Sequence, residues 1–293
     1  MTTPRSGEPV QPPAAGGPGW FDTHCHLNLD PLEAEADATW RRARANGVDR
    51  AVVVGIDAAS SRRAVELSAA LPGVWAAVGI HPTGTAAAAE RAGEFEAVEE
   101  LASARDPRVV AVGESGLDFY WPDSPREVQV EWLHRHVELA LRVDLPLVLH
   151  IRDAYAEAAA ELRRAAERGL RGIVHCFAGE AAEVEPFLDW NWPISFSGIL
   201  TYPKAENVRE AARRTPLELC LLETDAPWLT PRGAAAGVGG SAAKAAVNEP
   251  AHVVLTGAAL AELKQVDVAE LAAVTRANAM RCFGLVEPES PPG

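Results

Sequence analysis

Eight short apolar runs recur along this chain of 293 residues, and segments of helical character lie between them. The runs start near Gly19, Arg50, Val74, Val109, Pro146, Gly172, Pro193 and Leu219. Apolar strands that alternate with helices predict a parallel sheet, because each crossover helix returns the chain to the same edge. Eight such units predict a closed (β/α)8 TIM barrel, and a doubly wound open sheet is the alternative.

The expected barrel domain covers residues 19–285, close to the length of about 250 residues that is typical of this fold. Helices are expected over 31–46, 124–143, 153–168, 249–263 and 268–283. In the second of these, Ser124 is the expected N-cap and Pro125 occupies the first turn. Residues 1–18 and 286–293 are expected to be disordered tails. The Ala- and Gly-rich segment 233–247 is expected to be a mobile loop near the mouth of the barrel.

Ligand-type side chains stand where several of these apolar runs end. The first run leads into His24-Cys25-His26, and alternate side chains of a strand share a face, so His24 and His26 point together and Cys25 points away. Four other runs end at Glu114, His150, His175 and Asp225. The carboxyl ends of barrel strands surround one mouth, whereas an open sheet would spread them along an edge. The pattern therefore favours the barrel and predicts a single metal site at these strand ends.

The type and number of these side chains indicate two metal ions. Six protein ligands are too many for one catalytic ion that keeps a position open for water. They suffice for two ions about 3.5–4 Å apart, with Glu114 as the bridging ligand. Asp225 is the expected acceptor of the proton of the attacking water, so Glu114 and Asp225 are the expected catalytic residues. His and carboxylate ligands suit Mg²⁺ or Mn²⁺, with Zn²⁺ as an alternative.

Other residues near the expected site have two interpretations each. His81 either lines the substrate pocket or serves a turn, and Arg152 either contacts an anionic substrate group or pairs with a nearby acid. Asp118 either orients a ligand, binds substrate or lies in a solvated turn. The second H-x-H, formed by His134 and His136, lies in an expected helix, where residues two apart point about 200° apart. Both are therefore expected on the helix surface. Four aromatic residues follow ligand-bearing strands and either stack on bases or pack around loops: Phe119, Tyr120, Trp121 and Trp228.

The charge balance restricts the possible partners. The formal net charge is −14, which excludes a broad basic surface for nucleic acid, so a phosphodiester would have to be attracted by the local site. The four cysteines (Cys25, Cys176, Cys220 and Cys282) form no C-x-x-C pair and are expected to be reduced thiols. The sequence has no apolar signal core and no apolar run of about 18 residues. We therefore expect a soluble, cytoplasmic protein.

The chain resembles the TatD family of metal-dependent hydrolases, within the amidohydrolase superfamily. The resemblance covers about Phe21 to Leu285 through the motifs FDTHCHLN, GIHP, GESGLDFY, LHIRDA, GIVHCF, SFSGIL, LLETDAPWLTP and NEPAHV. It implies a TIM barrel and nuclease activity on DNA, often as a 3′-to-5′ exonuclease on single strands. It also implies metal-ligand roles for His24, His26, Glu114, His150, His175 and Asp225. Before NEP the family usually carries a compact basic stretch, which in this chain is replaced by the Ala/Gly segment that ends at Val247.

Three classes of function remain open from the sequence. The first is a two-metal deoxyribonuclease, whose expected partner is a single-stranded DNA end. The second is hydrolysis of another bond, such as a cyclic amide, a lactone or a D-aminoacyl ester on tRNA. The third is a non-catalytic, metal-stabilised scaffold. Many amidohydrolases bridge their metals with a carboxylated lysine, and Glu114 at that place favours the first class. We expect a monomer with no membrane partner and no obligate protein partner.

Overall fold

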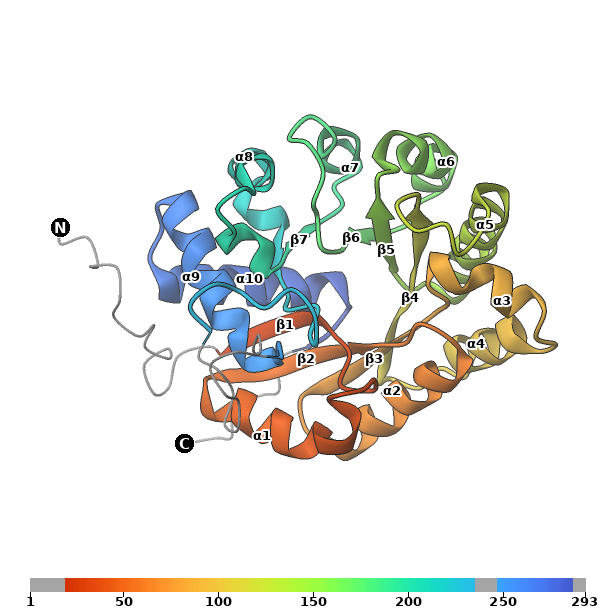
Figure 1. The fold of residues 1–293 in the computed structure, drawn as a ribbon, viewed down its shortest axis with the longest axis horizontal. Coiled ribbons are helices and arrows are strands. Elements are labelled where there is room, and N and C mark those ends of the chain that lie inside the picture. The colour runs from red at the N-terminus through yellow and green to blue at the C-terminus, as the bar shows by residue number, and fades with distance from the viewer. Residues whose placement is uncertain (1–18, 235–246, 287–293) are drawn as a thin grey trace.

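The structure is a computed structural model that describes residues 19–234 and 247–286. The expected tails and most of the expected loop over 233–247 lie outside these residues. The strands are β1 (Trp20–Cys25), β2 (Val48–Val54), β3 (Val74–Val78), β4 (Val109–Asp118), β5 (Leu147–Arg152), β6 (Gly172–Val174), β7 (Ile194–Phe196) and β8 (Cys220–Leu222). All of them are parallel, and they pair in sequence order from β1 to β8. The predicted barrel is therefore confirmed (Figure 1).

Ten α-helices of the described residues surround or cap the strands. They are α1 (Ala36–Ala45), α2 (Ala58–Ala70), α3 (Thr85–Ala89), α4 (Glu94–Ser103), α5 (Arg126–Val143), α6 (Tyr155–Glu167), α7 (Glu185–Asp189), α8 (Glu206–Arg214), α9 (Val253–Lys264) and α10 (Val268–Cys282). The expected N-cap of α5 is wrong, because Pro125 occupies that position and the Ser124 hydroxyl bonds to the Thr85 hydroxyl. In this part of the chain, no helix is both long and apolar enough to cross a membrane.

Side-chain and backbone contacts between the first and last strands close the barrel. Cys25 pairs with Ala226 in an isolated parallel bridge, and the backbone N–H of His26 donates to the Ala226 carbonyl over 2.8 Å. Asp22 is fully buried, and its carboxylate accepts hydrogen bonds from the Thr224 hydroxyl (2.6 Å) and the Thr224 N–H (2.9 Å). The segment after β8 thus completes the ring that the short strand β8 leaves open.

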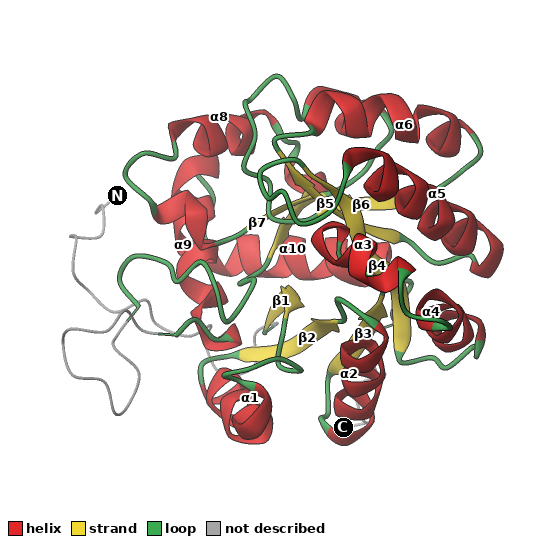
Figure 2. Cartoon of the chain, turned by 45° about the vertical axis from the view of Figure 1, so that its right-hand side comes forward, coloured by secondary structure: helices red, strands yellow, loops and turns green. Residues whose placement is uncertain are grey.

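Two apolar layers hold this architecture. The larger one lies between the strands and the outer helices, and the smaller one fills the lower barrel and is covered by α10. Figure 2 shows α10 running across the barrel, whereas α1 to α6 stand around its outside. The lower layer contains Phe21, Val52, Ala77, Val110, Val148, Ile173, Leu221, Met280 and Phe283. Apolar side chains therefore fill the amino-terminal end of the barrel, and the polar side chains of its interior lie at the carboxyl end.

Candidate metal centre

Seven ligand-type side chains converge at the carboxyl end of the barrel. His24 lies in β1 and His26 directly follows it, Glu114 lies in β4, His150 lies in β5, His175 directly follows β6, Asp225 follows β8 and His81 follows β3. The structure therefore brings together all six side chains that the sequence predicted as ligands. It adds His81, which the sequence left open.

Local irregularities in two strands aim these side chains into the barrel. Between Asp22 and Cys25, β1 has one residue more than the stretch Ala51 to Val53 with which it pairs. In the same way, β4 has one extra residue between Val112 and Ser115. Such bulges change the direction of side chains and are common beside active sites. The prediction that β4 ends at Glu114 is wrong: Glu114 lies in this bulge, and the strand continues to Asp118.

The first group of the centre consists of His24, His26 and Asp225. The Nε2 atoms of the two imidazoles lie 3.1 Å apart. Asp225 Oδ1 lies 3.8 Å from His24 Nε2 and 3.5 Å from His26 Nε2. The Asp225 N–H donates to the His24 carbonyl over 2.9 Å, which fixes this carboxylate beside β1. His26 Nδ1 contacts the Val54 carbonyl at 2.9 Å, so this nitrogen carries the proton and Nε2 offers its lone pair.

Glu114 connects the first group to a second one, formed with His150, His175 and His81. Glu114 Oε2 lies 3.1 Å from His175 Nε2 and 3.7 Å from His150 Nδ1. The same Oε2 atom also lies 3.7 Å from His24 Nε2, and Oε1 lies 3.7 Å from His26 Nε2. His81 Nε2 lies 3.3 Å from His150 Nδ1. Glu114 thus has the position of a ligand that two cations would share.

The crowding of ring nitrogens and carboxylate oxygens fits a cation. Neutral imidazole nitrogens repel one another at 3.1–3.3 Å unless a proton or a metal ion lies between their lone pairs. Burial, together with the neighbouring His175, lowers the pKa of His24 well below its usual value, which keeps that ring neutral. Burial raises the pKa of Glu114, but the facing imidazoles outweigh this and hold it well below its usual value. Burial would also lower the pKa of His26, His150 and His175, but the neighbouring carboxylates outweigh it and raise the pKa of all three rings, and a divalent metal bound there would displace their protons.

Two further carboxylates orient the histidines of the second group. Asp118 Oδ2 lies 3.0 Å from His150 Nε2, and Glu223 Oε1 lies 3.2 Å from His175 Nδ1. Both acids are buried. Carboxylates that hold the far nitrogen of a ligating histidine fix its tautomer and its ring direction. Asp118 therefore holds the His150 ring and does not lie in a solvated turn. Glu223 is a residue that the sequence motifs did not single out, although its position two residues before Asp225 in a strand-end run was a usable signal.

Of the remaining predicted residues, Arg152 and His134 are exposed, whereas His136 is buried. Arg152 forms no ion pair within the described ranges, and its guanidinium lies 3.9 Å from the centre of the Tyr120 ring. His134 is exposed and contacts Glu161, as expected. His136 is fully buried, so its predicted surface position is wrong. It accepts the Ile80 N–H over 3.1 Å because this side of α5 packs against the loop after β3.

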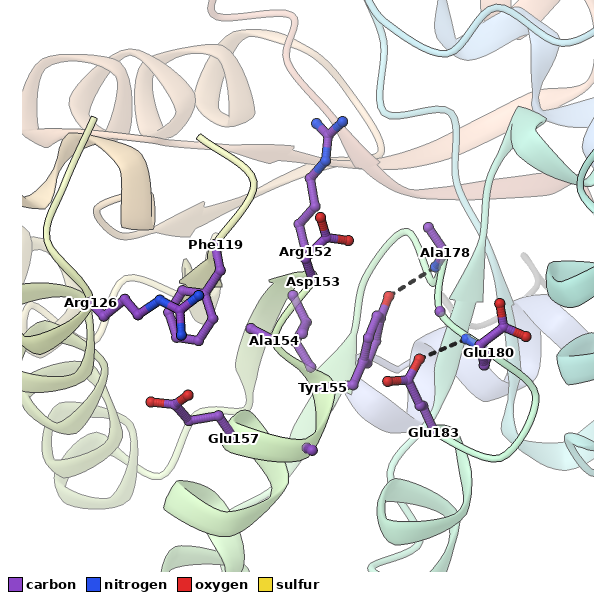
Figure 3. Close-up of a pocket in the computed structure, with 13 residues that line it drawn as sticks. Phe119, Arg126, Arg152, Asp153, Ala154, Tyr155, Glu157, Ala178, Glu180 and Glu183 are labelled. Atoms are coloured by element: carbon purple, nitrogen blue, oxygen red, sulfur yellow. Dashed lines mark hydrogen bonds between the residues drawn. The ribbon is translucent and has the colours of Figure 1, made fainter. Parts of the chain in front are cut away.

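A pocket of about 480 Å³ lies beside the centre, between α5 and α6 (Figure 3). In that view Arg126 lies against Phe119, Arg152 stands at the upper edge, and the Tyr155 hydroxyl accepts the Ala178 N–H. The lining contains two arginines and the four carboxylates of Asp153, Glu157, Glu180 and Glu183. With this excess of acids, the pocket does not attract a phosphate by its overall charge.

The comparisons with known proteins agree with this geometry. A family model described as TatD related DNase matches residues 21–284. An uncharacterized metal-dependent hydrolase of Bacillus subtilis, YabD, is 34% identical over 263 residues, which cover 90% of this chain and 98% of the relative. A protein of Erwinia tasmaniensis named 3′-5′ ssDNA/RNA exonuclease TatD is 32% identical over 267 residues, with 90% and 100% covered. The crystal structure of the TatD homologue YjjV from Escherichia coli superposes with a TM-score of 0.81 at 30% identity, and covers 91% of this chain and 98% of that one.

Proposed function

This chain belongs to the TatD-related DNase family of metal-dependent hydrolases, and we propose that it cleaves phosphodiester bonds at the ends of single-stranded DNA with two divalent metal ions. The observation that carries the proposal is the convergence of four histidines and two carboxylates on a buried space with Glu114 at its centre. The relative named as a 3′-5′ ssDNA/RNA exonuclease supports the choice of substrate.

We assign one metal to His24, His26 and Asp225, and the other to His150 and His175, with Glu114 between them. Mg²⁺ or Mn²⁺ is the proposed metal, and Zn²⁺ suits the same donors. Bound there, the ions would attract the phosphodiester, polarise its P–O bonds and make a water molecule more acidic. His81 contacts His150 and lies in one cluster with Glu114 and His150, so we assign it to substrate binding or to this metal.

The protein's own contribution to hydrolysis is position and proton transfer. Asp225 is the most exposed of the carboxylates in the cluster, with 15% of its side chain accessible, whereas Glu114 is nearly fully buried. We therefore assign Asp225 as the acceptor of the proton from the attacking water. Asp118 and Glu223 hold the rings of His150 and His175 in place. The lower apolar layer excludes water from the opposite end of the barrel.

A panel of substrates tests this proposal. The metal-free protein is reconstituted with Mn²⁺ or Mg²⁺ and offered single-stranded DNA, duplex DNA, RNA and D-aminoacyl-tRNA. We expect cleavage of single-stranded DNA that a chelator abolishes and added metal restores. If the protein hydrolyses the aminoacyl ester and leaves the DNA and RNA substrates uncleaved, its activity is that of an aminoacyl esterase and the proposed nuclease activity is rejected. Full activity after complete metal removal would reject metal-dependent hydrolysis altogether.

A further inference from the structure

The exposed aromatic side chains of this protein gather at the metal centre. Among the described Trp, Tyr and Phe residues, the exposed ones are Tyr120, Trp121 and Trp228, each with about half of its surface accessible (52%, 49% and 49%). The other described aromatic rings are buried or partly buried. Large apolar surfaces left in water at one place indicate a binding site.

The structure ties each of these rings to a residue of the centre. The Asp118 carboxylate, which holds His150, accepts the backbone N–H groups of Tyr120 (3.0 Å) and Trp121 (3.1 Å). The backbone N–H of Trp228 donates to the Asp225 carbonyl over 3.0 Å. Its ring lies edge-on to His26, with 5.1 Å between the ring centres. The backbone that carries these aromatic side chains is therefore fixed relative to the proposed metal ligands.

The rings occupy two opposite sides of the mouth. Tyr120 and Trp121 follow β4, whereas Trp228 follows β8, and these strands are four positions apart in a ring of eight. The Trp228 ring stands beside His26 of the first group, and the backbone of the other pair is bonded to Asp118, which holds His150 of the second group. Glu114 lies between the two groups. A phosphodiester bound over Glu114 would have one aromatic surface on each side.

The chemistry of these surfaces fits nucleobases. Stacking of bases on aromatic side chains tolerates any sequence, because every base has a π-face. Arg152 covers the Tyr120 ring at 3.9 Å and lies 5.8 Å from the Trp121 ring, so it adds a cationic group beside this surface. In a duplex, the neighbouring base pairs already occupy both faces of each base. Stacking on both sides of one phosphate therefore requires a single strand.

We propose that Trp228 and the pair Tyr120–Trp121 form two base-binding subsites, one for each base that flanks the scissile phosphate. This inference rests on the proposed function. The ligand class is a single-stranded nucleic acid with a base on both sides of the cleaved bond. The two subsites supply affinity without sequence preference, which suits an acidic protein that lacks a broad basic surface.

Oligonucleotides that lack one base test the proposal. The substrates are an intact single-stranded oligonucleotide and two analogues with an abasic residue on one or the other side of the first cleaved bond. The variants are Trp228→Ala, the double variant Tyr120→Ala/Trp121→Ala, and the conservative Trp228→Phe. His134→Ala, which removes an exposed ring on the outside of α5, is the control. KM and kcat are measured with Mn²⁺, together with the Mn²⁺ affinity of each variant.

We expect each alanine variant to raise KM for the intact substrate by at least about 5-fold, the lower end of measured stacking effects. The expected change in kcat is small, because stacking contributes equally to the ground state and the transition state. Trp228→Phe should restore most of the affinity. The effect of Trp228→Ala should vanish with one abasic analogue, and that of the double variant with the other.

Unchanged KM values in both alanine variants, with normal Mn²⁺ affinity, would overturn the inference while leaving the nuclease activity intact. The same conclusion would follow if each variant kept its full effect on both abasic analogues. If the parent protein cleaves no oligonucleotide in the presence of metal, the proposed function itself fails. The two failures are therefore distinguishable in one set of measurements.

Discussion

Replacing Glu223 by Gln should weaken metal binding without changing any proposed ligand. Glu223 Oε1 lies 3.2 Å from His175 Nδ1, and both side chains are buried. Glutamine keeps the size and an accepting oxygen but removes the charge. A hydrogen bond to a charged group contributes about 1.5–3 kcal/mol and a neutral one about 0.5–1.5 kcal/mol. The difference of about 1.4 kcal/mol corresponds to a roughly tenfold weaker affinity, at the lower end of the effects of such orienting residues.

Calorimetric titration of the metal-free protein with Mn²⁺ measures this change directly. Thermal unfolding gives an independent value, because at saturating metal a tenfold weaker site reduces the metal-induced stabilisation by about 1.4 kcal/mol. For a chain of this size that is a loss of about 3 °C in the metal-induced rise of Tm. Glu161→Gln is the matched control, since Glu161 contacts His134 at 2.8 Å on the outer surface. Parent-like affinity and an unchanged metal-induced shift in Glu223→Gln would refute the orienting role.

Four other expectations concern catalysis, the fold, pH and salt. Asp225→Asn should lower kcat by about 10²-fold, the usual scale for a general base, and near-normal turnover would show that this residue is only structural. Gly116→Ala should lower the urea midpoint by the equivalent of about 1–3 kcal/mol. The reason is that a Cβ at Gly116 would lie 1.9 Å from the His150 carbonyl oxygen, at a φ of +154°. Gly84→Ala, which has open space around it, should leave the urea midpoint unchanged. Burial lowers the pKa of His136 to about 4, so the unfolded chain takes up a proton that the folded chain refuses. Stability should therefore fall by up to about 3 kcal/mol as the pH drops from 6.5 to 4, and His136→Leu, measured by denaturant titration, should lack this component. DNA binding should depend only weakly on salt, and a slope that implies about six phosphate contacts would contradict the excess of acids in the pocket beside the centre.

The sequence predicted the barrel and its set of converging polar side chains because both follow from local rules. Apolar runs of strand length locate the starts of all eight strands to within about two residues. The rule that barrel strand ends share one mouth brings distant residues such as His24 and Asp225 together. The family resemblance inferred from the motifs is confirmed by the family model and the relatives.

The features that the sequence did not predict depend on neighbouring elements. The bulge at Glu114 is a property of the register between β4 and β5, which the periodicity of one strand does not contain. His136 is buried because α5 packs on the loop after β3, so a helix considered alone gives the wrong side. The strand-end run contains Glu223, but its contact with His175 is a property of how β6 and β8 lie in the barrel. Each of these errors is therefore one of tertiary packing.

The junction between β1 and the segment after β8 couples metal binding to the opening of the barrel. His24 lies in the first strand and His26 directly follows it, whereas Asp225, about 200 residues later, follows the last strand. A cation held by these three residues would link the two ends of the ring, which are joined by the isolated bridge between Cys25 and Ala226. Closing so long a loop removes much conformational freedom from the open state. We therefore expect the metal-free protein to open first at this junction, and amide exchange in β1 and β8 to slow when a metal ion binds.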